Sequence, residues 1–182
     1  ERLPAFVPRE AAAVYSSPLR RAAETAERLA VRLRAPLVVE PDLREVQLGR
    51  WEGLTVPEIQ AAFPGQYERW REDPAGCPAP GAEPLADLAE RTTSALRRIL
   101  QAHPGRPLIL VAHGGTIRAL VCHALGLPIR HLFRIQQDNS AVSQIEIAAE
   151  SRRLLRLNDT THLLAGGAAV AARDVITEGP TV

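Results

Sequence analysis

The chain has 182 residues, 46% of them hydrophobic, and its net charge at pH 7 is +1. This length suits one compact domain, and so small a charge argues against a protein whose main ligand is nucleic acid. No apolar run approaches the roughly 20 residues of a membrane-spanning helix, so we expect neither a nucleic-acid nor a membrane partner.

The first part of the chain alternates apolar runs with helical patterns. Alanine and leucine residues spaced for one helix face follow the first apolar run, as expected for a helix packed on a sheet. The elements predicted before residue 73 are a strand at 11–15, a helix at 19–33, a strand at 36–40, a loop at 42–55 and short helices at 56–63 and 66–72.

A loop rich in proline and glycine at 73–84 precedes the second part of the chain. The elements predicted there are a helix at 85–102, a buried strand at 107–111, a helix at 116–125, and strands at 141–147 and 154–157 that pair across a turn near Ser151.

Strands that alternate with helices predict an α/β fold. We expect a three-layer sandwich, in which a mostly parallel sheet carries helices on both faces. One domain is expected over 1–164, followed by a loosely held tail over 165–182 that is rich in alanine and glycine.

A histidine follows the clearest buried strand. Leu108–Val111 leads through Ala112 into His113-Gly114-Gly115, and the two glycines would let the backbone turn tightly before the next helix begins. The carboxyl end of a parallel strand beside a helix start favours anions. The segment therefore predicts an anion site at His113 and Gly114; the alternative is a histidine that merely caps a turn.

Charged residues also follow the first two strands. Arg20 and Arg21 open the helix after Ser17-Pro18, and an arginine there can clamp two phosphate oxygens at once. Taken alone, either arginine is more commonly part of a surface ion pair. The loop after the second strand carries Glu45 beside Trp51, which by itself is a weak signal.

Taken together and in this order, the three segments resemble the phosphoglycerate mutase-like branch of the histidine phosphatase superfamily. The family pattern S-x-L-x-R-A-x-x-T-A matches residues 17–26, and the resemblance implies that Arg21 binds phosphate. The pattern L-R-E-x-x-x-G-x-W-E-G matches residues 43–53, which implies that Glu45 is the proton donor. The likeness extends over about residues 14–163.

The family's H-G-G segment falls on His113. The resemblance implies that His113 is the second active-site histidine and that His113, Gly114 and Arg21 bind the phosphoryl group. It also implies the phosphoglycerate mutase-like fold and a site without metal or cofactor.

One family motif is missing from the 182 residues. In the family the first strand ends in Arg-His-Gly, whose histidine attacks phosphorus, and no Arg-His-Gly occurs here. Since the sequence begins with Glu1 and contains no methionine, we expect a preceding segment that carries the first strand and the nucleophile. The alternatives are an inactive domain that binds phosphate esters or another partner, and a piece that folds only with help.

The resemblance implies a metal-independent phosphatase that hydrolyses a small phosphorylated metabolite through a phosphohistidine. The short segment 55–84 resembles small phosphatases, including broad-specificity and α-ribazole-phosphate types, and leaves a phosphoglycerate mutase as the second choice. Cys77 and Cys122 lack the spacing of a zinc site or of a disulfide framework, which predicts a reducing, cytoplasmic setting. A homodimer is compatible with the sequence.

Overall fold

The computed structural model describes residues 7–148 and 151–164, so the predicted tail over 165–182 lies outside the described residues. None of the helices in the described ranges is both long and apolar enough to cross a membrane. In chain order the elements are β1 (Ala13–Ser16), α1 (Arg20–Leu33), β2 (Leu37–Val39), η1 (Pro41–Leu43), η2 (Gly49–Trp51), α2 (Val56–Ala62), α3 (Gln66–Glu72), α4 (Leu85–Ala102), β3 (Leu108–Val111), α5 (Gly114–Leu125), η3 (Ile129–Arg134), β4 (Val142–Ile147), β5 (Arg152–Asp159) and α6 (Thr161–Leu164).

Three parallel strands form the central sheet in the order β2-β1-β3. Ser16 at the end of β1 pairs with Val39 of β2 and Val111 of β3, so all three strands finish at one edge of the sheet. The strands β4 and β5 form a separate antiparallel pair, which confirms the predicted pairing across a turn near Ser151. Within the described residues β3 pairs with β1 alone.

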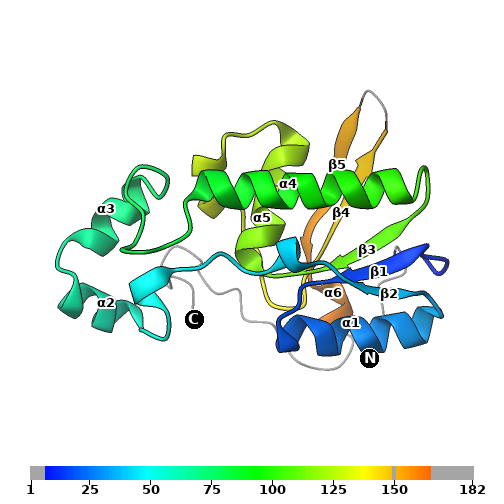
Figure 1. Ribbon diagram of the computed structural model, residues 1–182, viewed down its shortest axis with the longest axis horizontal. Coiled ribbons are helices and arrows are strands. Elements are labelled where there is room, and N and C mark those ends of the chain that lie inside the picture. The colour runs from blue at the N-terminus through cyan, green and yellow to red at the C-terminus, as the bar shows by residue number, and fades with distance from the viewer. Residues whose placement is uncertain (1–6, 149–150, 165–182) are drawn as a thin grey trace.

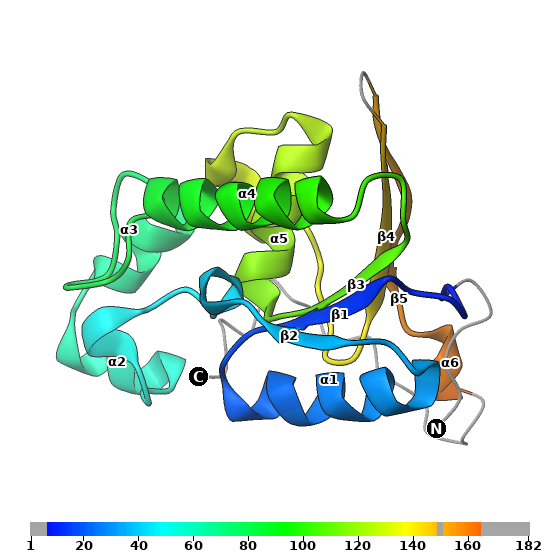
Figure 2. The ribbon, with the colours of Figure 1, turned by 45° about the vertical axis from the view of Figure 1, so that its right-hand side comes forward.

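Helices cover both faces of the sheet because side chains along a strand alternate between its faces. Val14 of β1 packs with Ala26 and Ala30 of α1. The next residue, Tyr15, belongs to the cluster on the opposite face, where Ile99 of α4 lies. Figure 2 shows α1 below the sheet and α4 above it. The predicted three-layer α/β sandwich is therefore confirmed.

A smaller unit built on α2 and α3 lies beside the sheet (Figure 1). Its core is aromatic: the ring centroids of Trp51 and Trp70 are 5.6 Å apart, and those of Trp70 and Phe133 of η3 are 4.7 Å apart. The predicted loop over 42–55 overlaps the short 3₁₀ turn η1 and contains a second such turn, η2. The second of these turns buries Trp51, which is only 2% exposed, so a large apolar side chain shapes a segment that lacks any helical repeat.

The helix after β3 begins earlier than predicted. Gly114 and Gly115 form the first turn of α5, and His113 is the extended residue before it, with φ −125° and ψ 169°. Glycine disfavours helices, so the sequence predicts a turn at these two residues. At Gly115 a side chain has no room, because an added Cβ would lie 2.6 Å from Oε1 of Glu45. The turns η3 and α6 were not predicted.

Candidate active site

The site lies where β1 and β3 end. The backbone N–H of Ser17 donates to the carbonyl of Val111 at 2.9 Å and so extends the β1–β3 ladder by one residue. This places His113, two residues after β3, beside Ser17: the imidazole Nε2 and the Ser17 hydroxyl share a hydrogen bond of 2.7 Å. His113 is 7% exposed and Ser17 is fully buried, so the structure fixes the orientation of the ring.

Glu45 reaches the same place from the loop after β2. Its carboxylate accepts hydrogen bonds from the backbone N–H of Gly115 at 3.2 Å and of Thr116 at 3.3 Å. A third bond of 2.9 Å comes from the N–H of Val46. The amides at the start of α5 therefore hold a carboxylate, in keeping with the preference of helix N-termini for anions.

Arg21 stands in the first turn of α1 and is exposed. Within the described residues its guanidinium takes part in no hydrogen bond or ion pair, whereas its neighbour Arg20 binds Glu24 at 2.7 Å. The charge of Arg21 nevertheless reaches His113, since it contributes to lowering the pKa of that imidazole. Of the two arginines, Arg21 has the guanidinium that an incoming anion can bind.

His113 is held toward its neutral form. Burial is the main cause that lowers its pKa below the ordinary 6.5, and the positive charges of Arg21 and Arg91 act in the same direction. The negative charge of Glu45 opposes them without reversing the shift. A phosphate dianion beside the ring would favour the protonated form, so binding of substrate and protonation of His113 reinforce each other.

This shift predicts how stability depends on pH. As pH falls below 6.5, the unfolded chain binds a proton at this histidine and the folded chain does not, so the free energy of unfolding decreases. His113→Asn should flatten that decrease by at most about 1.4 kcal/mol per pH unit. Urea unfolding at several pH values would measure the slope. His123, whose pKa burial also lowers, keeps its own contribution in both proteins; an unchanged slope in the variant would contradict the prediction.

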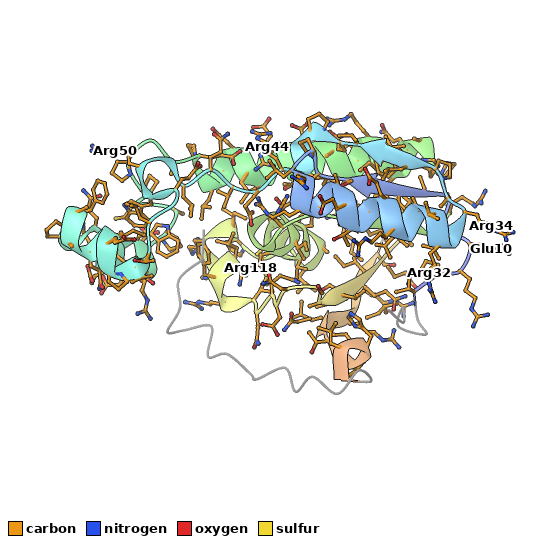
Figure 3. All side chains as sticks on the ribbon, turned by 90° about the horizontal axis from the view of Figure 1, so that it is seen from below. Glu10, Arg32, Arg34, Arg44, Arg50 and Arg118 are labelled. Carbon is orange, nitrogen blue, oxygen red and sulfur yellow. The ribbon has the colours of Figure 1, made fainter. Side chains whose placement is uncertain are left out.

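Gly114 lies between two charged side chains. A Cβ added there would be 3.2 Å from Nη1 of Arg118 and 3.9 Å from Oε2 of Glu45. Arg118 extends from α5 (Figure 3) and donates from Nε to the carbonyl of Ile135 at 2.8 Å. A side chain at this position would therefore press on the guanidinium of Arg118.

Several further side chains of this region were not predicted from the sequence. Ser17 stands inside the motif at 17–26, and Thr116 donates from Oγ1 to the carbonyl of Arg44 at 2.6 Å. Arg118 follows Gly114 by one helical turn, and that spacing could have indicated it. Arg91 lies 46 residues from Glu45, so no local pattern points to it.

His103 lies in an ordinary structural position. Nε2 of His103 and the hydroxyl of Tyr15 share a hydrogen bond of 3.0 Å at the end of α4. In the part of the chain that the structure describes, no group of three or more His, Cys, Asp or Glu side chains could hold a metal ion.

The chain matches known proteins in sequence and in overall fold. A family model described as "Histidine phosphatase superfamily (branch 1)" matches residues 2–160. Among curated relatives, the putative phosphoserine phosphatase 2 of Hydrogenobacter thermophilus is 32% identical over 157 residues, which are 86% of this chain and 77% of that protein.

Solved structures of other proteins have a similar fold. A mycobacterial glucosyl-3-phosphoglycerate phosphatase in complex with inorganic phosphate superposes with a TM-score of 0.75 at 34% identity, covering 83% of this chain and 78% of that one. YhfR of Bacillus stearothermophilus superposes with a TM-score of 0.78 at 28% identity, covering 85% of this chain and 77% of that one.

Proposed function

The chain belongs to the histidine phosphatase superfamily, and from this premise we propose that it hydrolyses phosphate monoesters of small metabolites through a phosphohistidine, without a metal ion. The observation that carries the proposal is the meeting of Arg21, His113 and Glu45 at the carboxyl edge of the sheet. Relatives that are named phosphatases, for phosphoserine and for glucosyl-3-phosphoglycerate, favour a phosphatase over a mutase.

Arg21 and His113 would bind the phosphoryl group. The planar guanidinium of Arg21, which has no partner among the described residues, can donate two parallel hydrogen bonds to phosphate oxygens. The imidazole of His113 adds a third donor from the floor of the site, where Ser17 fixes its orientation. Donors held in place before the reaction stabilise the charge on the equatorial oxygens of the transition state.

Phosphoryl transfer would proceed in two displacements. A neutral histidine nitrogen attacks phosphorus and forms the N–P bond while the ester P–O bond breaks, and protonated Glu45 gives its proton to the leaving alcohol. Water then attacks phosphorus, Glu45 takes up a proton from that water, and the N–P bond breaks to release inorganic phosphate and the free histidine.

We propose that the nucleophilic histidine comes from outside these 182 residues. The sequence has no Arg-His-Gly, the segment whose histidine attacks phosphorus in the family, and His113 is assigned to binding the phosphoryl group. Support also comes from β3, whose second edge pairs with no strand within the described residues and whose four side chains are only half-buried. A strand added there would end beside His113, because parallel strands finish at the same edge.

The cellular setting is proposed to be the cytoplasm. Cys77 and Cys122 are both free thiols, and burial raises the pKa of Cys122, which keeps that thiol protonated and unreactive. Free cysteines are ordinary in a reducing compartment.

The function can be tested by trapping the phosphoenzyme. Full-length protein mixed with a radiolabelled phosphate monoester and quenched within one turnover should carry about one phosphate per chain, bound in the acid-labile, base-stable manner of a phosphohistidine. EDTA should leave the turnover rate unchanged. Peptide mapping should place the phosphate on a histidine outside residues 1–182, and the intact mass should exceed 19.8 kDa.

Three outcomes would contradict the proposal. Saturable binding of esters without hydrolysis would indicate an inactive binding domain. Hydrolysis without any phosphoenzyme would exclude the intermediate. Transfer of the phosphate between phosphoglycerate positions, with little release to water, would identify a mutase.

A further inference from the structure

A buried ion pair lies next to the site without being part of it. Arg91 of α4 and Glu83, just before α4, form a bidentate pair: Nε binds Oε1 at 2.6 Å, and Nη2 binds Oε2 at 2.8 Å. Their side chains are 9% and 8% exposed. Burial raises the pKa of Glu83, but the hydrogen bonds and charge of Arg91 outweigh it and leave that pKa below its ordinary value, so both partners are charged.

The remaining donors of Arg91 bind the loop that carries Glu45. Nη1 donates to the carbonyl of Asp42 at 2.6 Å and to that of Arg44 at 2.9 Å. Nη2 donates to the carbonyl of Glu45 itself at 3.2 Å. The five N–H groups of the guanidinium are matched by five hydrogen bonds, two to Glu83 and three to this loop.

Glu83 holds the other side of the same loop. Its Oε2 accepts from the backbone N–H of Gln47 at 3.4 Å, and its Oε1 lies 3.4 Å from Nη2 of Arg44, a residue labelled in Figure 3. The pair therefore contacts residues on both sides of Glu45. This support matters because residues 45–48 belong to no helix or strand, so no regular backbone pattern fixes their path.

Stability alone gives a weak reason for such a pair. Removing two charges from water costs several kcal/mol, and apolar side chains of similar volume often replace a buried pair without loss. The guanidinium of Arg91 donates to the carbonyl groups of Asp42, Arg44 and Glu45, and so fixes the backbone of the loop at defined points, which an apolar side chain cannot do.

We propose that Arg91 and Glu83 are positioning residues that place the carboxyl group of Glu45 for proton transfer to the leaving group. The inference rests on the proposed phosphatase function. Arg91 touches no reacting atom; it acts through the carbonyls of the loop, and a displacement of about 1 Å in a catalytic group can cost 10²-fold in rate.

The chain supplies a matched control on the same helix. Arg98 follows Arg91 by two turns and also reaches the loop before Glu45, but it binds the side chains of Glu40 at 3.1 Å and Asp42 at 2.8 Å instead of backbone carbonyls. Its side chain is 53% exposed. Replacing either arginine by lysine keeps the charge and removes the planar fork.

The test compares two esters in the full-length protein. Glycerol phosphate has a poor leaving group that needs a proton, whereas p-nitrophenyl phosphate has one that leaves as an anion. Arg91→Lys should lower kcat/KM for glycerol phosphate at least about tenfold more than for p-nitrophenyl phosphate, since proton donation contributes about 10²- to 10⁴-fold. Glu83→Gln should show the same preference with a smaller loss. Arg98→Lys should leave the ratio of the two rates unchanged.

A double variant separates positioning from general disturbance. In a Glu45→Gln background, Arg91→Lys should cause no further loss that is selective for glycerol phosphate, because the group it positions is already gone. Thermal unfolding of each variant checks that it folds. If Arg91→Lys does not fold, Glu83→Gln is compared in its place.

Equal losses of kcat/KM on both esters would overturn the positioning role, and so would an additive loss in the double variant. Arg91 and Glu83 would then be an ion pair with a structural role only. A wild-type protein that hydrolyses neither these two esters nor any of a panel of other phosphate monoesters would instead refute the proposed function itself, so the two failures are distinguishable.

Discussion

Arg21→Ala is expected to lower kcat/KM for phosphate monoesters by about 10²- to 10³-fold, the usual effect of removing one donor that stabilises a developing negative charge. The reason lies in the position of this side chain. Arg21 is near enough to His113 to influence its pKa, yet its guanidinium has no partner among the described residues, so an incoming phosphate meets a free cation. Binding of inorganic phosphate as an inhibitor should weaken together with turnover.

Arg20→Ala is the control for that experiment. Arg20 is the preceding residue of the same helix, its side chain is 92% exposed, and it binds Glu24 one turn later. Surface pairs of this kind contribute about 0–1 kcal/mol to stability, so the variant should fold normally and keep its activity within about twofold. Initial rates and competition by inorganic phosphate would measure both effects. Similar losses in the two variants would show that Arg21 has no special role in binding phosphate.

Glu45→Gln is expected to lower the hydrolysis of alkyl phosphates by about 10²- to 10⁴-fold, which is the range for loss of a general acid. Hydrolysis of p-nitrophenyl phosphate should decrease much less, because its leaving group departs without a proton. Glutamine has nearly the same shape, and its side-chain carbonyl can take the place of Oε1, which accepts from the amides of Val46 and Thr116. Its NH2 group cannot accept from the amide of Gly115 as Oε2 does, so the variant removes the proton together with one backbone hydrogen bond.

The exposed Glu52 provides the comparison, since it lies on the same loop and accepts a hydrogen bond from the N–H of Leu48 at 3.2 Å. Glu52→Gln should change neither rate appreciably. Steady-state kinetics with a series of alkyl and aryl esters would give the dependence of rate on leaving-group pKa for each variant. If Glu45→Gln slowed both kinds of ester to the same extent, the assignment of Glu45 as proton donor would be wrong.

The sequence by itself determined the layers of the fold. Apolar runs at 11–15, 36–40 and 107–111 contain the strands β1, β2 and β3, and helices lie between them. Burial on both faces explains the apolar run of β1, whereas the three residues of β2 are exposed, so there the β-branched and apolar side chains indicate strand preference and not burial. The resemblance of two motifs to those of a known family also predicted roles for Arg21 and Glu45, which spacing alone did not assign. Nearby residues along the chain set where strands end and helices begin, so the sequence alone can predict these positions.

Tertiary structure alone decided how the site is held together. The bond between Ser17 and His113 joins residues 96 positions apart, and Arg91 reaches carbonyls of a loop 46 to 49 positions before it. The early start of α5 likewise depends on Glu45, whose carboxylate contacts the amide of Gly115 and leaves no room for a side chain there. No local propensity encodes these contacts, because each depends on which residues the packed layers bring within hydrogen-bond distance.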